Sequence, residues 1–246
     1  MSGHSKWSTI KRQKEATDKQ RGKIFTKLGR AISVAVRQGG GTTDPEMNFK
    51  LRLAIEKARQ ANMPRVNIDR AISSGAGGNG DQSWEEMMYE GFGPAGTAVM
   101  VKVVTNNRNR TLGEIKQIFD KGGGNLGQSG TVGFMFDQVG WLWLDTEGKD
   151  NEGLMLELME IGGVLDVDLV QSEEKEMVEL FTEPNKFKQV KDQIIDRGVK
   201  VVEAELIMKP KTMRQLSGEE KERVSRFIEK MEESDDVQQV FCDVEL

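Results

Sequence analysis

The chain has 246 residues, of which 37% are hydrophobic and 30% are charged, and its formal net charge is −5. This length allows two or three modest hydrophobic cores. No apolar run reaches the roughly 20 residues that cross a bilayer, the N-terminus lacks the apolar core of a secretion signal, and the single cysteine, Cys242, cannot form an internal disulfide; we therefore expect a cytoplasmic protein without membrane contact.

Charge is divided unevenly along the chain. Residues 1–78 hold eight Lys and eight Arg against six acidic residues, a balance of +10, which leaves −15 for the remainder. The basic residues are densest between His4 and Lys27. This separation indicates contact with a polyanion, while an acidic body would limit unspecific binding.

The first 78 residues predict a basic arm followed by three helices. Apolar residues recur at helical spacing from about Gln20 to the glycines at 39–41, and again from Asp44-Pro45, which we interpret as a cap and a first-turn proline. A short third helix is expected over 65–74, with Val66 among its apolar contacts. Residues 75–81 have the composition of a flexible hinge.

Beyond this hinge the pattern becomes mixed. Residues 97–105 predict a strand, and 109–121 predict a helix that begins with a capping box of Thr111 and Glu114 and turns Leu112 inward. Residues 121–133 form a glycine-rich loop. We interpret it as a structural turn, because a phosphate-binding loop would follow a strand and end in Gly-Lys-Ser/Thr.

The order of elements over 134–209 is βαββαβ, which is typical of a ferredoxin-like domain. A C-terminal helix should begin at a capping box of Ser217 and Glu220, and a strand over 237–244 should pair with the strand at 97–105. The predicted fold is therefore α+β. It comprises an N-terminal three-helix domain (1–78), a discontinuous α/β middle domain (79–133 and 210–246) and an inserted ferredoxin-like domain (134–209).

The basic run supplies the candidate nucleic-acid-binding residues. They are His4, Lys6, Trp7, Lys11, Arg12, Lys14, Lys19, Arg21, Lys23 and Lys27. Only Trp7 adds an aromatic ring, which favours phosphate contacts over base reading. The alternative is a solvated charged face, and for His4 a solvated terminal residue.

Enzyme chemistry finds little support in the sequence. His4 is the only histidine, so histidine-based catalysis and His-ligated metals lack material, and we expect no metal, cofactor or small-molecule substrate. The acidic groups, including Glu85, Glu86 and Glu90, are interpreted as exposed faces. A carboxylate-dependent, metal-using nuclease is the rival from the enzyme class. Trp141 and Trp143 share one side of a strand, where core or interdomain packing is the first interpretation and a partner surface the second.

Several ordered motifs together resemble the YebC/PmpR family, whose eukaryotic relative is the mitochondrial translational activator of cytochrome c oxidase subunit I. They are Gly3-His4-Ser5-Lys6-Trp7, Asn48–Ala58 with Asn62-Met63-Pro64, Tyr89-Glu90-Gly91-Phe92-Gly93-Pro94, Asn107-Arg108-Asn109-Arg110-Thr111 and Gly127–Asp137. Thr42, Thr43 and Asn106 depart from the usual pattern without affecting the expected fold.

The resemblance implies a helical N-terminal domain followed by two α/β domains. It also implies a cytoplasmic protein that is a probable transcriptional regulator and binds DNA. Some family members are instead linked to the ribosome and to relief of stalling at proline runs, so ribosomal RNA is the alternative partner. We expect a non-enzymatic protein in either case.

Overall fold

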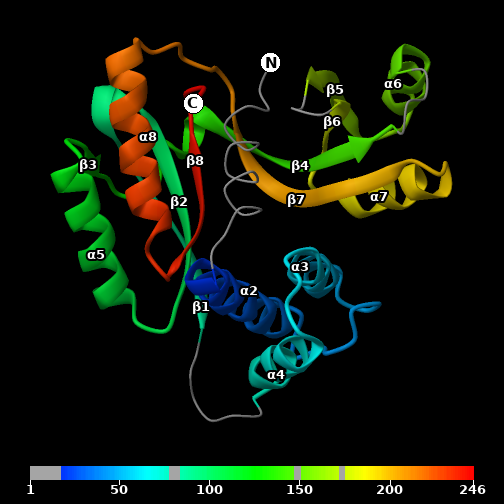
Figure 1. The fold of residues 1–246 in the computed structure, drawn as a ribbon, viewed down its shortest axis with the longest axis horizontal. Coiled ribbons are helices and arrows are strands. Elements are labelled where there is room, and N and C mark those ends of the chain that lie inside the picture. Colours follow the sequence, from blue (N-terminus) through cyan, green and yellow to red (C-terminus); the bar gives the residue numbers. More distant parts are fainter. Residues whose placement is uncertain (1–17, 78–83, 147–150, 172–174) are drawn as a thin grey trace. The chain divides into compact units, whose positions relative to one another are not determined.

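The computed structural model describes residues 18–77, 84–146, 151–171 and 175–246, with the side chains from residue 21 onward (Figure 1). Its mixture of helices and two four-stranded sheets confirms the predicted α+β class. The described residues form two compact units: one contains those between 136 and 209, and the other contains those between 18 and 135 and those from 210 to 246. Within the described ranges, no helix is long and apolar enough to cross a membrane.

Three helices form the first part of the larger unit, as predicted: α2 (Asp18–Gln38), α3 (Phe49–Gln60) and α4 (Arg65–Gly75). Their apolar faces meet in one core that includes the fully buried Ile32, Leu51 and Ala58. Helix α4 passes close to α2 at Gly75, where an added β-carbon would lie 2.6 Å from the Ser33 carbonyl oxygen. A side chain at this position would force the helices apart.

The start of α3 differs from the prediction. Asn48, not Asp44, is its N-cap: the Asn48 side chain accepts a hydrogen bond from the Leu51 N–H at 3.1 Å and donates one to the Ala35 carbonyl at 2.8 Å. Asp44 instead accepts from the Glu46 N–H in a preceding turn. The cap that also joins α3 to α2 satisfies more buried polar groups than an isolated Asp-Pro start. Val66 is 67% exposed and is not the apolar contact that we predicted.

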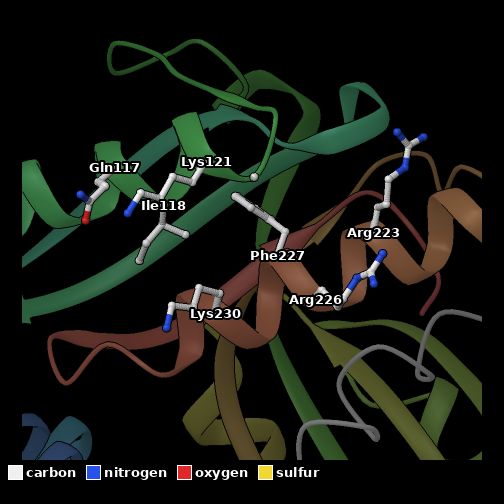
Figure 2. Close-up of a pocket in the computed structure, with 8 residues that line it drawn as sticks. Gln117, Ile118, Lys121, Arg223, Arg226, Phe227 and Lys230 are labelled. Carbon is white, nitrogen blue, oxygen red and sulfur yellow. The ribbon is translucent and has the colours of Figure 1, made fainter.

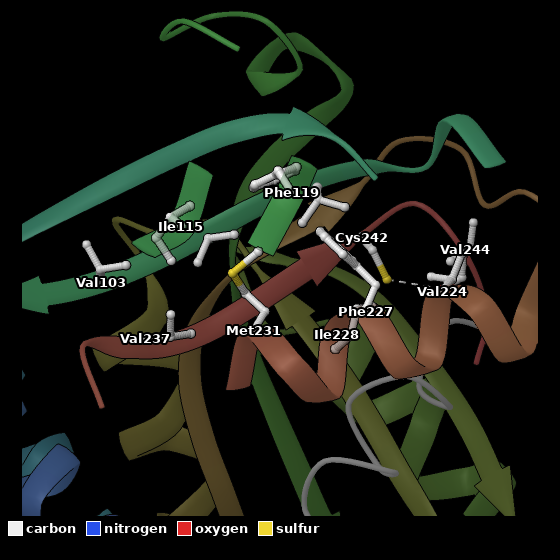
Figure 3. Packing of buried hydrophobic residues seen from close by; sticks show 12 residues of the cluster. Val103, Ile115, Phe119, Val224, Phe227, Ile228, Met231, Val237, Cys242 and Val244 are labelled. Atoms are coloured by element: carbon white, nitrogen blue, oxygen red, sulfur yellow. Dashed lines mark hydrogen bonds between the residues drawn. The ribbon is translucent and has the colours of Figure 1, made fainter. Parts of the chain in front are cut away.

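The second part of the larger unit is a sheet in the order β3-β1-β2-β8. Its strands are β1 (Glu85–Phe92), β2 (Ala98–Thr105), β3 (Asn125–Leu126) and β8 (Val237–Cys242), and two helices accompany them, α5 (Arg108–Lys121) and α8 (Gly218–Glu232). The C-terminal strand pairs antiparallel with β2, Val101 opposite Val240, which confirms the predicted return of the chain. Figure 3 shows the core between sheet and helices, where Phe119 and Phe227 meet edge to face at 5.2 Å.

Several details of this part were not predicted or were predicted wrongly. Strand β1 was missed, and with it the burial of Glu90. The capping box at Thr111 and Glu114 was wrong, because Asn107 caps α5 by accepting from the Arg110 N–H. Leu112 is 43% exposed. The Ser217–Glu220 capping box of α8 is confirmed.

The smaller unit has the predicted βαββαβ order. Its elements are β4 (Phe136–Asp145), α6 (Asn151–Met159), β5 (Val164–Gln171), β6 (Glu176–Thr182), α7 (Phe187–Asp196) and β7 (Lys200–Pro210). The sheet order β5-β6-β4-β7 is that of the split βαβ arrangement. Trp141 and Trp143 are both buried and stack with ring centroids 5.9 Å apart, in agreement with a packing role.

Candidate nucleic-acid interface

Most of the predicted contact residues precede the described part of the chain. His4, Lys6, Trp7, Lys11, Arg12 and Lys14 lie outside the described residues, and so does the side chain of Lys19. Arg21, Lys23 and Lys27 lie on α2, the first two exposed and Lys27 partly buried. Their roles in binding remain a prediction, but the structure shows what Lys23 and Lys27 contact.

One face of α2 meets the C-terminal end of α8. The Lys27 ammonium donates to the Glu232 carbonyl oxygen at 2.6 Å, and the Lys23 ammonium lies 3.5 Å from the Glu233 carbonyl oxygen. The last carbonyls of a helix lack intrahelical partners and carry partial negative charge, so they attract cations. Burial lowers the pKa of Lys27 to about 8, outweighing the opposing effect of Glu232 and Asp235. Lys27 is thus a cation that the fold already uses.

Asp236 holds the next turn of the same α2 face. Its carboxylate accepts from Arg30 at 2.9 Å, from Arg110 at 2.6 Å and from the Thr111 hydroxyl at 2.6 Å. Burial alone would raise the pKa of Asp236, but these donors lower it below its ordinary value. Arg30 also lies over the Trp84 ring, 4.6 Å from its centroid. Arg30 and Asp236 therefore join the helical part to the sheet.

Glu90 has a comparable structural role within the sheet part. Its side chain accepts hydrogen bonds from the backbone N–H groups of Gly130, Val132 and Gly133 at 2.7–3.0 Å. Burial would raise the pKa of Glu90, yet the three N–H donors hold it below its ordinary value. Glu90, which belongs to the Tyr89–Pro94 motif on β1, thus fixes the loop that contains the Gly127–Asp137 motif. The interpretation of Glu90 as part of an exposed acidic face was wrong.

The glycine-rich loop is structural, as expected. An added β-carbon at Gly124 would lie 2.4 Å from the Phe92 carbonyl oxygen, and one at Gly91 would lie 2.5 Å from the Asn125 carbonyl oxygen. These glycines allow β3 to approach β1 closely enough to pair with it.

Other carboxylates have cationic partners. Asp145 lies 2.6 Å from the Lys175 ammonium, and Asp166 lies 3.2 Å from the Lys209 ammonium. No group of three His, Cys, Asp or Glu side chains that could hold a metal ion occurs within the described ranges. Cys242 is buried beside the Val244 carbonyl, and burial raises the pKa of its thiol to about 12.

Known families and proteins match the whole length of the chain. The N-terminal domain of the TACO1/YebC protein matches residues 5–78, and the TACO1/YebC second and third domains match residues 84–244. A protein of Pelotomaculum thermopropionicum, named a probable transcriptional regulatory protein, is 47% identical over 248 residues, covering 100% of this chain and 99% of that one. A protein of the same name from Thermoanaerobacter pseudethanolicus is also 47% identical, with 100% and 98% covered.

A solved structure shares the fold. The crystal structure of a conserved hypothetical protein from Aquifex aeolicus matches with a TM-score of 0.81 at 42% identity, and the match covers 93% of this chain and 91% of that chain.

Proposed function

Because the chain belongs to the TACO1/YebC family, several of whose members are named probable transcriptional regulatory proteins, we propose that it is a transcriptional regulator that binds DNA through its basic N-terminal domain. The observation that carries this proposal is the +10 balance of residues 1–78 in a chain of net charge −5. Lysines and arginines that neutralise phosphates release counterions, and this release drives association.

The contacts of α2 suggest that different parts of the basic run have different roles, some anchoring the helix and others binding nucleic acid. Lys27 and Arg30 anchor the middle of α2 to the sheet part. Residues 18–23 continue the same helix toward the N-terminus. The cations on the part of α2 that precedes Lys23 are therefore carried by a helix that is anchored at its middle. The binding segment in this proposal is therefore centred on Lys6–Arg21.

We expect the N-terminal domain to contact phosphates more than base edges. The second and third helices offer few cations without an intramolecular partner: Lys50 contacts Gln38, Arg52 contacts Glu46 and Arg65 contacts Asp69. A recognition helix would instead present Arg, Asn or Gln side chains to the major groove. The protein that we propose is thus a non-enzymatic DNA-binding protein with weak sequence selectivity.

A salt titration with matched charge variants tests the proposal. Deleting residues 1–27 would remove half of α2, including Ile24 and Phe25, which pack on the helical core. Point changes avoid this damage: the arm variant is Lys6→Gln/Lys11→Gln/Lys14→Gln, and the control is Lys186→Gln/Lys188→Gln/Arg197→Gln on exposed positions of the smaller unit. Binding to a labelled 30-base-pair duplex is measured at several salt concentrations.

We expect the arm variant to bind at least tenfold more weakly than the native chain at low salt. The slope of log affinity against log salt should fall by about 0.9 for each lost phosphate contact. The control should retain affinity and slope. Equal binding by arm variant and control would contradict the proposal. Crosslinking in cells that recovers ribosomal RNA without promoter DNA would move the function to the ribosome.

A further inference from the structure

A groove between α5 and α8 is lined by cations. It has a volume of about 350 Å³, and Lys121 of α5 lines it together with Arg223, Arg226 and Lys230 of α8 (Figure 2). None of the described residues that line it is acidic. The groove lies in the part of the chain whose summed charge is negative, so the charge balance of the sequence conceals it.

The floor of the groove is apolar and tightly built. Ile118 and Phe227 line it, and Phe227 is itself packed edge to face on Phe119. An added β-carbon at Gly122 would lie 2.4 Å from the Phe227 ring. A side chain at Gly122, the residue that caps α5, would therefore displace the Phe227 ring from the floor of the groove.

Most cations of this groove, namely Lys121, Arg223 and Arg226, make no side-chain hydrogen bond or ion pair within the described ranges. The charge of Arg223 adds to the Ser217 hydrogen bonds that lower the pKa of Glu220. Lys230 alone has a partner, the exposed Glu233 carboxylate at 2.7 Å. An anion bound in the groove would be attracted by each of the cations that line it.

The spacing of the cations suits a chain of phosphates. Arg223, Arg226 and Lys230 follow each other at intervals of three and four residues and so form one row on α8. Arg223 and Lys230 are separated by about 10 Å along the helix axis. Projected on the duplex axis, one strand carries a phosphate about every 3.4 Å, so the row spans roughly three phosphate intervals along that axis. An arginine can hold one phosphate with two parallel hydrogen bonds.

We propose that the groove between α5 and α8 is a second nucleic-acid contact, which binds successive phosphates of one strand. The inference rests on the proposed function for its ligand class, but it assigns a separate site on a separate part of the chain. The arm supplies the larger share of the attraction, and the groove adds fixed contacts that orient the strand.

A double variant with a control on the same two helices tests this site. The groove variant is Lys121→Gln/Arg226→Gln. The control, Lys116→Gln/Lys221→Gln, removes one exposed cation from each helix outside the groove and changes the net charge equally. Two measurements are made on full-length chains: the salt dependence of binding to the 30-base-pair duplex, and the backbone amide shifts caused by a six-nucleotide oligothymidylate.

We expect the salt slope of the groove variant to fall by about 1.8, which corresponds to two lost duplex phosphate contacts. The amides of residues 117–122 and 223–230 should shift with the oligonucleotide in the native chain and the control, but not in the groove variant. Unmoved groove amides in the native chain, or equal slopes for groove variant and control, would overturn the site. So would an oligo-aspartate peptide that shifts these amides at lower concentration than the oligonucleotide, since the groove would then suit an acidic protein partner.

Failure of the proposed function has a different signature. If neutralising the arm leaves duplex binding unchanged while the groove variant weakens it, the arm is not the DNA-binding segment and the groove still is a nucleic-acid site.

Discussion

Two groups of three cations differ in their surroundings. One group lies on one face of α2 and consists of Lys23, Lys27 and Arg30. The other lies around the groove between α5 and α8 and consists of Lys121, Arg223 and Arg226. The first three contact helix-end carbonyls or the Asp236 carboxylate. The second three line a hollow without acidic residues. The basic segment thus contains cations that the fold employs, and the acidic body contains cations that it does not. A sum of charges along the sequence does not show which cations are available to a ligand.

Removing Asp236 should have the largest effect on stability. Asp236→Asn leaves Arg30 and Arg110 facing an amide in place of a buried carboxylate, and Arg110 is only half buried, so we expect a loss of about 3 kcal/mol. Urea unfolding of the full chain measures it. The exposed Asp120→Asn is the control and should stay within about 0.5 kcal/mol. Equal stability of the two variants would show that α2 is not anchored through Asp236.

Glu90→Gln should cost less, about 2 kcal/mol, because an amide oxygen cannot satisfy three backbone donors as a carboxylate does. The folded pKa of Glu90 is lowered, so its contribution is present above its ordinary pKa, near 4.5, and is lost as pH falls below that value. Urea unfolding at pH 7 and pH 3.5 should therefore show a smaller difference between native and variant chains at the lower pH. Glu183→Gln, an exposed position, serves as the control. A gap that widens at pH 3.5 would contradict the structural role of Glu90.

The burial of Lys27 should make the free energy of unfolding depend on pH. Between about pH 8 and its ordinary pKa of 10.5, the unfolded chain binds the Lys27 proton and the folded chain releases it, so stability from this residue rises with pH. Because Lys27 is partly screened by solvent, we expect the rise to be about 1 kcal/mol between pH 7.5 and 9.5. Lys27→Met should lack the rise that the native chain and an exposed-site control, Lys116→Met, both show in urea unfolding. A native chain that loses stability relative to Lys27→Met over this range would contradict the burial of the amine.

The smallest effect concerns the groove cations. Lys121→Gln/Arg226→Gln should change the free energy of unfolding by no more than about 0.5 kcal/mol, since neither side chain has a partner within the described ranges to lose. Thermal unfolding of this variant beside Lys27→Met separates the two sets directly. A destabilisation above about 1.5 kcal/mol would mean that the groove cations serve the fold.

The sequence predicts regular elements where local patterns are strong. The capping box at Ser217 and the alternating valines of β2 each contain their own signal, and the βαββαβ order identified the smaller unit. Strand β1 was missed because Glu85, Glu86, Glu90 and Gly91 weaken its alternation, while pairing with β2 along its whole length stabilises it. Asn48 was missed as a cap because its second hydrogen bond is to a distant helix.

The sites show a similar limit. The density of basic residues before Lys27 is visible in the sequence, and the binding role of the arm stays a prediction because most of its residues lie outside the described ranges. The docking of Lys27 depends on residues some 205 positions away, as does the pairing of Arg30 with Asp236. The groove combines α5 with α8, about a hundred residues apart, around a glycine whose importance appears only when Phe227 is placed against it. Contacts of this kind require the tertiary structure.

The stacked pair of Trp141 and Trp143 has an optical consequence. Two indole rings 5.9 Å apart and inclined by 27° are coupled chromophores, whose electronic transitions mix and give a paired circular-dichroism band. That band disappears when the rings separate. Both rings belong to the unit of residues 136–209, whereas Trp84 belongs to the other unit. The chain therefore carries a spectroscopic reporter within the unit of residues 136–209, and the melting of that unit can be followed without a label.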